Sequence, residues 1–99
     1  MSFIDYLENT DELVKKFNST VEFVQQWEEG KKTSNEQKLE AYKYYKQAMI
    51  GDINIPEPSF INFTAKSKWN AWNSVKGTEK YDAMIKYIEI IEEQKKMFN

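Results

Sequence analysis

Apolar residues recur at helical spacing in four stretches of this chain, and polar or proline-containing links separate these stretches. The first stretch runs from about residue 10 to residue 28 and begins with acidic residues, which favour a helix N-terminus. We expect Gly30 to end this helix. Phe23 falls off the apolar stripe, so it either packs on the preceding residues or is exposed. The stripe predicted to face the core is Leu13, Phe17, Val21, Val24 and Trp27.

The second stretch runs from Ser34 to Ile50 and contains neither glycine nor proline. Gln37 follows Ser34 at the spacing of a capping box, in which each residue satisfies a free backbone N–H of the other. Gly51 is predicted to stop the helix. The residues predicted to face the core are Leu39, Ala41, Tyr45, Ala48 and Met49.

Residues 52–62 form a long link that contains Pro56 and Pro58 and sustains no helical or strand period. A long loop in a small domain is more often functional or packed than free. Its apolar residues therefore predict an ordered, packed crossover, and they are Ile53, Ile55, Phe60, Ile61 and Phe63.

Two more helices are expected after this crossover. The third is short, from about Lys66 to Lys76, and carries Trp69, Trp72 and Val75 on one face. Thr78 is predicted to cap the fourth. Four helices with one long crossover indicate an all-α four-helix bundle. The stripe of the fourth helix is Met84, Tyr87, Ile88 and Ile91, with Phe98 as a further candidate.

Length and composition restrict the number of domains and the classes of function that the chain can have. The chain has 99 residues, of which 40% are hydrophobic, and this suits a single domain over residues 1–99. We interpret residues 1–9 as an N-terminal extension that forms either a short helical turn or a tail held against the bundle. The formal net charge of −2 argues against a general nucleic-acid binder. Histidine and cysteine are absent, which excludes imidazole and thiol catalysis and zinc sites built from these ligands.

Localisation is predicted from the apolar runs and the N-terminal residues. No apolar run approaches the ~20 residues that a membrane helix needs. The N-terminal residues carry neither a basic region nor a continuous apolar segment. We therefore expect a cytoplasmic protein.

Tyrosines and lysines are concentrated in the second helix, between Tyr42 and Lys46. Tyr42, Tyr45 and Lys46 fall at i, i+3 and i+4, so they share one helical face. Two phenol rings and an ammonium group can together stack on a ring, donate hydrogen bonds and neutralise an anion. The same residues also suit an ordinary helix with half-buried tyrosines and a lysine that extends into solvent. The face alone does not decide between these interpretations.

The motifs that surround this face resemble those of the acyl-CoA-binding protein family. They are Y-K-Q-A-M-I-G-D at 45–52, K-S-K-W-N-A-W at 66–72 and A-M-I-K-Y-I at 83–88. The resemblance covers roughly Phe17 to Met97. It implies an up-down-down-up bundle in which the two helices that flank the long crossover run parallel, and it implies a monomer.

The resemblance also implies a site for the nucleotide end of coenzyme A. In this interpretation the lysines neutralise phosphate, Tyr42 and Tyr87 donate hydroxyl hydrogen bonds, and the ring of Tyr45 stacks on adenine. The implied acyl-CoA-binding residues are Tyr42, Tyr45, Lys46, Lys68 and Tyr87.

Further candidate ligand contacts are Gln25, Lys38, Lys43 and Tyr44. Gln25 stands where many family members have a lysine, so a charged contact becomes a weaker neutral hydrogen bond. Lys38 stands where an apolar residue is common, and it can restore a cation at the rim. Trp69 and Trp72 either line the acyl channel or, as we favour, belong to the core.

The implied function is that of a lipid-binding, lipid-transport protein. It binds medium- and long-chain fatty acyl-CoA, carries it inside the cell and forms a pool of it, without catalysis, cofactor or metal. Enzymes that use acyl-CoA are implied partners, and membrane contact is at most transient because no helix joins a strongly basic face to a broad apolar one. The alternative is a helical protein-interaction module that kept the fold and lost the ligand, with Phe3, Tyr6 or Phe23 at its interface. No spacing of carboxylates or tyrosines points to an enzyme.

Overall fold

The structure is a computed structural model that describes residues 10–98 of the chain. None of these residues belongs to a β-strand, so the predicted all-α fold is confirmed. The extension predicted over residues 1–9 lies outside the described residues. The elements are α2 (Thr10–Gln26), the 3₁₀ helix η1 (Glu29–Lys32), α3 (Asn35–Met49), α4 (Phe63–Ser74) and α5 (Lys80–Lys96).

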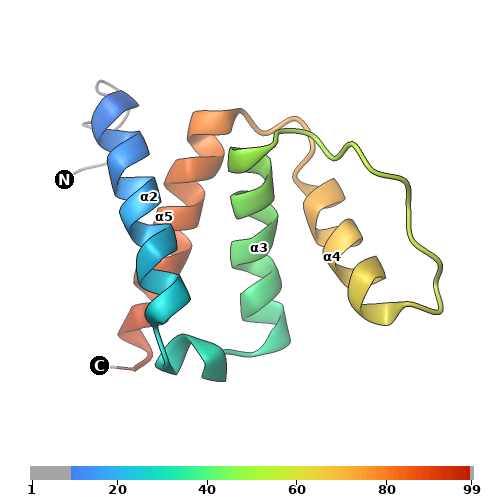
Figure 1. Ribbon diagram of the computed structural model, residues 1–99, viewed down its shortest axis with the longest axis horizontal. Helices are drawn as coiled ribbons and strands as arrows, with labels where there is room; N and C mark the ends of the chain where they lie inside the picture. Colours follow the sequence, from blue (N-terminus) through green and yellow to red (C-terminus); the bar gives the residue numbers. More distant parts are fainter. Residues whose placement is uncertain (1–9, 99) are drawn as a thin grey trace.

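The four α-helices have the up-down-down-up arrangement that the family resemblance implied (Figure 1). Helices α2 and α5 run in one direction, and α3 and α4 run in the other. The parallel pair α3 and α4 is joined by the long crossover, which passes over the top and down the right-hand side of Figure 1. Helix α5 packs against α2 and α3, and α3 packs against α4. The resulting body is flat, with principal extents of 43 × 31 × 17 Å.

Helix α5 supplies most of the hydrophobic core. Leu13 and Phe17 of α2 and Ala48 of α3 are buried against it. These contacts confirm the stripes predicted for the first and fourth helices, because both stripes face each other across the same core. The stripe ends before Phe98, which is exposed. The buried apolar residues of α5 are Ala83, Met84, Ile85, Tyr87, Ile88 and Ile91.

Helix α3 begins and ends where the sequence predicts. The Ser34 hydroxyl accepts a hydrogen bond from the Gln37 N–H at 3.1 Å, and the Gln37 side chain accepts one from the Ser34 N–H at 2.8 Å. This is the predicted capping box. The helix ends at Met49, and Gly51 adopts a φ of 102°, a left-handed conformation that glycine reaches without a steric penalty.

Other helix ends differ from the prediction because local contacts override the sequence signals. Helix α2 ends at Gln26, and Gly30 lies inside η1 rather than ending the helix. Asn62 caps α4 by accepting a hydrogen bond from the Ala65 N–H at 3.2 Å, so this helix begins before the predicted start. Helix α5 is capped by Glu79 and not by the predicted Thr78.

The crossover is not packed as predicted. Ile55, Phe60, Ile61 and Phe63 are all exposed, and so is Met49 at the end of α3. Gln47, two residues earlier on α3, is buried instead, and its side chain donates hydrogen bonds to Asp52 Oδ1 at 2.8 Å and to the Thr78 carbonyl at 2.9 Å.

Indole groups of α4 hold the crossover in place instead. Trp72 Nε1 donates to the carbonyl of Gly51, and Trp69 Nε1 donates to the carbonyl of Ile55, each at 2.9 Å. Trp72 is also buried, which confirms its prediction as a core residue.

Candidate functional site

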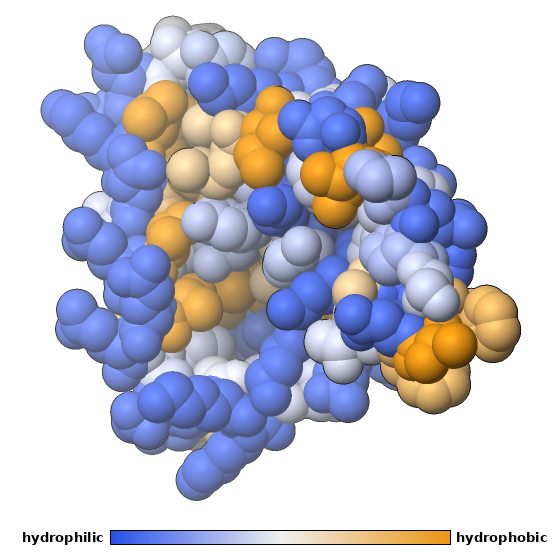
Figure 2. All heavy atoms as spheres, turned by 45° about the vertical axis from the view of Figure 1, so that its right-hand side comes forward, coloured by the Kyte–Doolittle hydropathy of each residue, from blue (hydrophilic) through white to orange (hydrophobic). Residues whose placement is uncertain are grey.

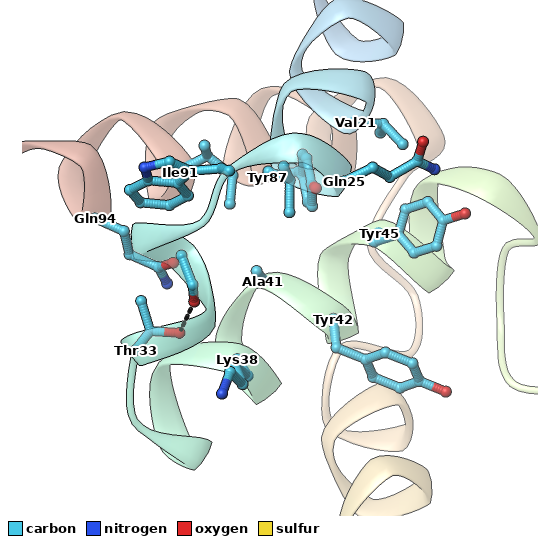
Figure 3. Close-up of a pocket in the computed structure, with 13 residues that line it drawn as sticks. Val21, Gln25, Thr33, Lys38, Ala41, Tyr42, Tyr45, Tyr87, Ile91 and Gln94 are labelled. Atoms are coloured by element: carbon cyan, nitrogen blue, oxygen red, sulfur yellow. Dashed lines mark hydrogen bonds between the residues drawn. The ribbon is translucent and has the colours of Figure 1, made fainter.

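A pocket of about 290 Å³ lies between α2, η1, α3 and α5 (Figure 3). Its middle is apolar, phenol rings stand at one end, and an ammonium, an amide and a hydroxyl group stand at the other. The two ends therefore offer different chemistry to one ligand. The lining residues are Val21, Val24, Gln25, Trp27, Gly30, Thr33, Lys38, Ala41, Tyr42, Tyr45, Tyr87, Ile91 and Gln94.

The tyrosine end is held in place by Phe17 of the core. The Phe17 ring centroid lies 5.3 Å from that of Tyr87 and 6.4 Å from that of Tyr45, and the two tyrosine centroids are 6.0 Å apart. Figure 3 shows the rings of Tyr42 and Tyr45 with their hydroxyl tips directed away from the centre of the pocket. The apolar parts of these rings thus border the pocket while their polar tips face its outer end.

Burial disfavours ionisation of two phenols in this site. Burial and, to a smaller extent, the neighbouring Tyr45 raise the pKa of Tyr87 to about 12. Burial also raises the pKa of Tyr42. At neutral pH these hydroxyl groups are therefore hydrogen-bond donors, which suits them to bind an anion.

Two lysines from neighbouring helices lie beside this end. Lys68 Nζ of α4 is 5.7 Å from the ring centroid of Tyr42, and Lys46 Nζ of α3 is 4.9 Å from the ring centroid of Trp72. Within residues 10–98 neither ammonium group forms an ion pair with a carboxylate. Their charge is therefore available to an anionic ligand.

The opposite end of the pocket is polar, and its polar groups are hydrogen-bonded within the chain. Lys38 Nζ donates to the carbonyl of Lys31 at 2.9 Å, and Thr33 Oγ1 donates to the carbonyl of Gly30 at 2.8 Å, the contact drawn in Figure 3. Gln94 Nε2 donates to the carbonyl of Gln37 at 2.9 Å. These bonds satisfy the polar groups without a ligand, so this end is preformed.

Trp27 forms the wall behind this end. Its ring centroid is 5.3 Å from that of Phe23 and 5.7 Å from that of Phe98, which meets it edge-on. Phe23 itself is exposed, which is one of the two alternatives predicted for it.

A family described as acyl-CoA-binding protein matches residues 14–91, which is most of the chain. The chain belongs to the acyl-CoA-binding protein family. It is 49% identical over 63 residues to the acyl-CoA-binding protein of Dictyostelium discoideum, a match that covers 64% of this chain and 75% of that protein. It is 43% identical over 82 residues to the acyl-CoA-binding domain-containing protein 6 homolog of the same organism. That match covers 81% of this chain but spans only 28% of the relative.

Solved structures of acyl-CoA-binding proteins share the fold. Acyl-CoA-binding protein 2 of Oryza sativa superimposes with a TM-score of 0.79 at 31% identity, covering 87% of this chain and 93% of the other. The acyl-CoA-binding protein of Moniliophthora perniciosa gives a TM-score of 0.72 at 41% identity over 81% of this chain and 80% of the other.

The acyl-CoA-binding fold brings most of the sequence-predicted residues together. Tyr42, Tyr45 and Tyr87 line the pocket, as do Gln25 and Lys38, while Lys46 and Lys68 flank its tyrosine end.

Lys43 and Tyr44 lie outside the pocket. Lys43 Nζ pairs with Glu40 at 2.6 Å, and the ring of Tyr44 packs against the core from the other side of α3. Thr33 and Gln94 line the pocket but were not predicted as site residues. Neither belongs to a motif, and only the folded chain brings them to one end of the pocket.

Residues 10–98 contain no cluster of three or more side chains that could hold a metal ion. Within the same part of the chain, no helix has the length and apolar character needed to cross a membrane. Acyl-CoA-binding proteins take acyl-CoA as their ligand and use no cofactor.

Proposed function

We propose that this chain binds medium- and long-chain fatty acyl-CoA thioesters and acts as their non-catalytic intracellular carrier and pool former. The observation that carries the proposal is the pocket, in which an apolar interior meets three phenol groups, together with Lys46 and Lys68 beside it, which no carboxylate of residues 10–98 pairs. Membership of the acyl-CoA-binding protein family supports the same ligand. We extend the proposal to residues 1–99 as a single acyl-CoA-binding domain that works as a monomer in the cytoplasm.

The nucleotide end of the ligand is assigned to the tyrosine end of the pocket. Lys46 and Lys68 neutralise phosphate groups, and the hydroxyl groups of Tyr42 and Tyr87 donate hydrogen bonds to phosphate oxygens. The ring of Tyr45 stacks on adenine. The outward direction of the tyrosine tips in Figure 3 supports this assignment because the bulky nucleotide then stays at the surface.

The acyl chain is assigned to the apolar middle of the pocket. Val21, Val24 and Ile91 line this part together with the ring of Trp27. Each buried methylene contributes about 0.8 kcal/mol before the cost of ordering the chain. The acyl tail therefore supplies much of the affinity, while the phosphate contacts select for the CoA ester over the free acid.

The proposal assigns no chemical step to the pocket. Burial raises the pKa values of Tyr42 and Tyr87 above that of an ordinary phenol, so neither hydroxyl is activated as a base or nucleophile. The Thr33, Lys38 and Gln94 side chains at the inner end donate hydrogen bonds to backbone carbonyls.

Isothermal titration of the purified chain with palmitoyl-CoA tests this function. We expect tight one-to-one binding of the thioester and much weaker binding of free CoA and of free palmitate. Lys46→Ala should weaken binding of palmitoyl-CoA, whereas Lys43→Ala, on the same helix but paired with Glu40, should not. If a folded chain binds none of the three ligands, the carrier function is wrong and a protein-interaction role takes its place.

A further inference from the structure

Three large apolar side chains project into solvent where the crossover meets α4. Phe60, Ile61 and Phe63 are 76%, 75% and 79% exposed, the highest values among the exposed large apolar residues of the described chain. We call these three residues the apolar tip. In Figure 1 the segment forms the lower right corner of the molecule, and Figure 2 shows orange atoms gathered at the lower right beside a hollowed face. A concentrated apolar projection of this kind marks an interaction surface.

Two backbone N–H groups at the apolar tip, those of Ile61 and Asn62, are paired within the chain. The Ile61 N–H donates to Ser59 Oγ at 3.3 Å, and the Asn62 N–H donates to the Ser59 carbonyl at 3.1 Å. Asn62 Oδ1 in turn accepts from the Ala65 N–H at 3.2 Å. A lipid environment offers no partners to a free backbone N–H, so internal pairing lowers the cost of entering it.

Aromatic and cationic side chains follow directly behind the tip. Lys66 and Trp69 both lie on α4, and Lys66 Nζ is 5.6 Å from the centroid of the Trp69 ring. The same ammonium group forms an ion pair with Glu57 at 2.7 Å. Lys68 lies between Lys66 and Trp69 in the sequence, and α4 carries these two lysines and no carboxylate. Ammonium groups and an indole that follow an apolar tip on one helix suit a bilayer surface, where apolar side chains enter the acyl boundary and cations and indoles lie at the level of the head groups.

We propose that the apolar tip docks on the surface of a lipid bilayer that contains anionic lipids. Phe60, Ile61 and Phe63 enter the acyl boundary, and Lys68 faces lipid phosphates. The purpose of docking rests on the proposed carrier function, because Lys68 lies beside Tyr42 and docking therefore brings the tyrosine end of the pocket to the membrane. Three side chains give reversible attachment, as collecting or delivering a ligand requires.

Co-sedimentation of the purified chain with phosphatidylcholine vesicles, with and without 30% phosphatidylglycerol, tests the docking without acyl-CoA. We expect binding that increases with phosphatidylglycerol. The triple variant Phe60→Ser, Ile61→Ser, Phe63→Ser should bind at least about tenfold more weakly, because it loses the side chains that enter the bilayer. The matched control is Met49→Ser, Ile50→Ser, which removes two exposed apolar side chains from the far end of α3 and should bind like the wild type.

A single fluorophore reports where the chain touches the vesicle. The sequence has no cysteine, so Phe60→Cys and Ile50→Cys each introduce one thiol for an environment-sensitive dye. The dye at residue 60 should shift to the blue on vesicle addition, and the dye at residue 50 should not.

Several outcomes would overturn the docking. These are a wild type that does not bind vesicles, equal losses in the tip and control variants, or a solution dimer that the tip substitutions abolish. Solution titration of the triple variant with palmitoyl-CoA should match the wild type within about twofold, since the tip does not line the pocket. Failure of that titration in the wild type would count against the carrier function alone.

Discussion

Gly30→Ala should destabilise the protein through its contact with Trp27. A Cβ atom at residue 30 would lie 2.9 Å from Trp27 Cδ2 and closer still to Trp27 Cε3, which is closer than carbon atoms approach. The indole cannot move away freely, because the rings of Phe23 and Phe98 lie 5.3 and 5.7 Å from it. The substitution therefore forces the indole or η1 to shift at the inner end of the pocket.

The size of the effect follows from two opposing contributions. Overpacking of this kind costs about 1–3 kcal/mol. An alanine also restricts the unfolded chain and returns about 0.4–1 kcal/mol, since Gly30 does not adopt a left-handed φ. The net loss should be about 1–2 kcal/mol. In a domain of this size each kcal/mol lowers the melting temperature by about 4–8 °C.

A double-mutant cycle measures the contact directly. Urea unfolding is followed for the wild type, Gly30→Ala, Trp27→Leu and the double variant. Trp27→Leu removes the ring that the new Cβ meets, so the alanine should be neutral or slightly stabilising in that background. Equal losses in the two backgrounds would refute the reasoning, because the cost would then come from the backbone of η1 and not from the indole.

Three further substitutions test the site and its supports. Lys46→Ala should weaken palmitoyl-CoA binding by about tenfold in calorimetry through loss of a charge-assisted contact, with free palmitate binding and the urea midpoint unchanged. Tyr87→Phe should weaken palmitoyl-CoA binding by about fivefold and remove the tyrosine that titrates near pH 12 in absorbance. Because burial raises the pKa of Tyr87, the wild type should lose stability as the pH rises from 10 to 12. Tyr87→Phe should lose less stability over this pH range. Hydrogen bonds from the Gly77 N–H and the Gln47 side chain lower the pKa of Asp52, so Asp52→Asn should destabilise the chain at pH 6. This difference should shrink below the ordinary aspartate pKa as Asp52 becomes protonated, and a pH-independent difference would contradict the assignment.

The helices could be predicted from the sequence because one core sets their periodicity. The stripes of Leu13 and Phe17 in α2 and of Tyr87 and Ile91 in α5 repeat at helical spacing since both face the same interior. Helix ends depend on single contacts that periodicity does not record. Gly30 reads as a stop signal, but its lack of a side chain serves the approach of an indole.

The candidate site was only partly predictable for a related reason. Tyr42, Tyr45 and Lys46 share a face of one helix, so their spacing alone brings them together. Thr33 and Gln94 meet at the inner end only because α5 folds back against η1 and α3. The exposure of Phe60 was also beyond sequence reasoning, because an apolar loop residue looks the same whether it is packed or projects into solvent.

The serial packing of the helices has a consequence for how the protein opens. Helix α4 packs mainly on α3, and the crossover is tied to it by two indole hydrogen bonds. The crossover and α4 therefore form a cooperative unit that detaches at a lower free energy than global unfolding, and its amides should exchange with solvent before those of α5. When this unit detaches, Lys68 moves away from the pocket while Tyr45 and Tyr87 stay packed against Phe17. Under the proposed ligand assignment, the Lys68 contact is then released before the tyrosine contacts, so we expect acyl-CoA to leave in an ordered sequence.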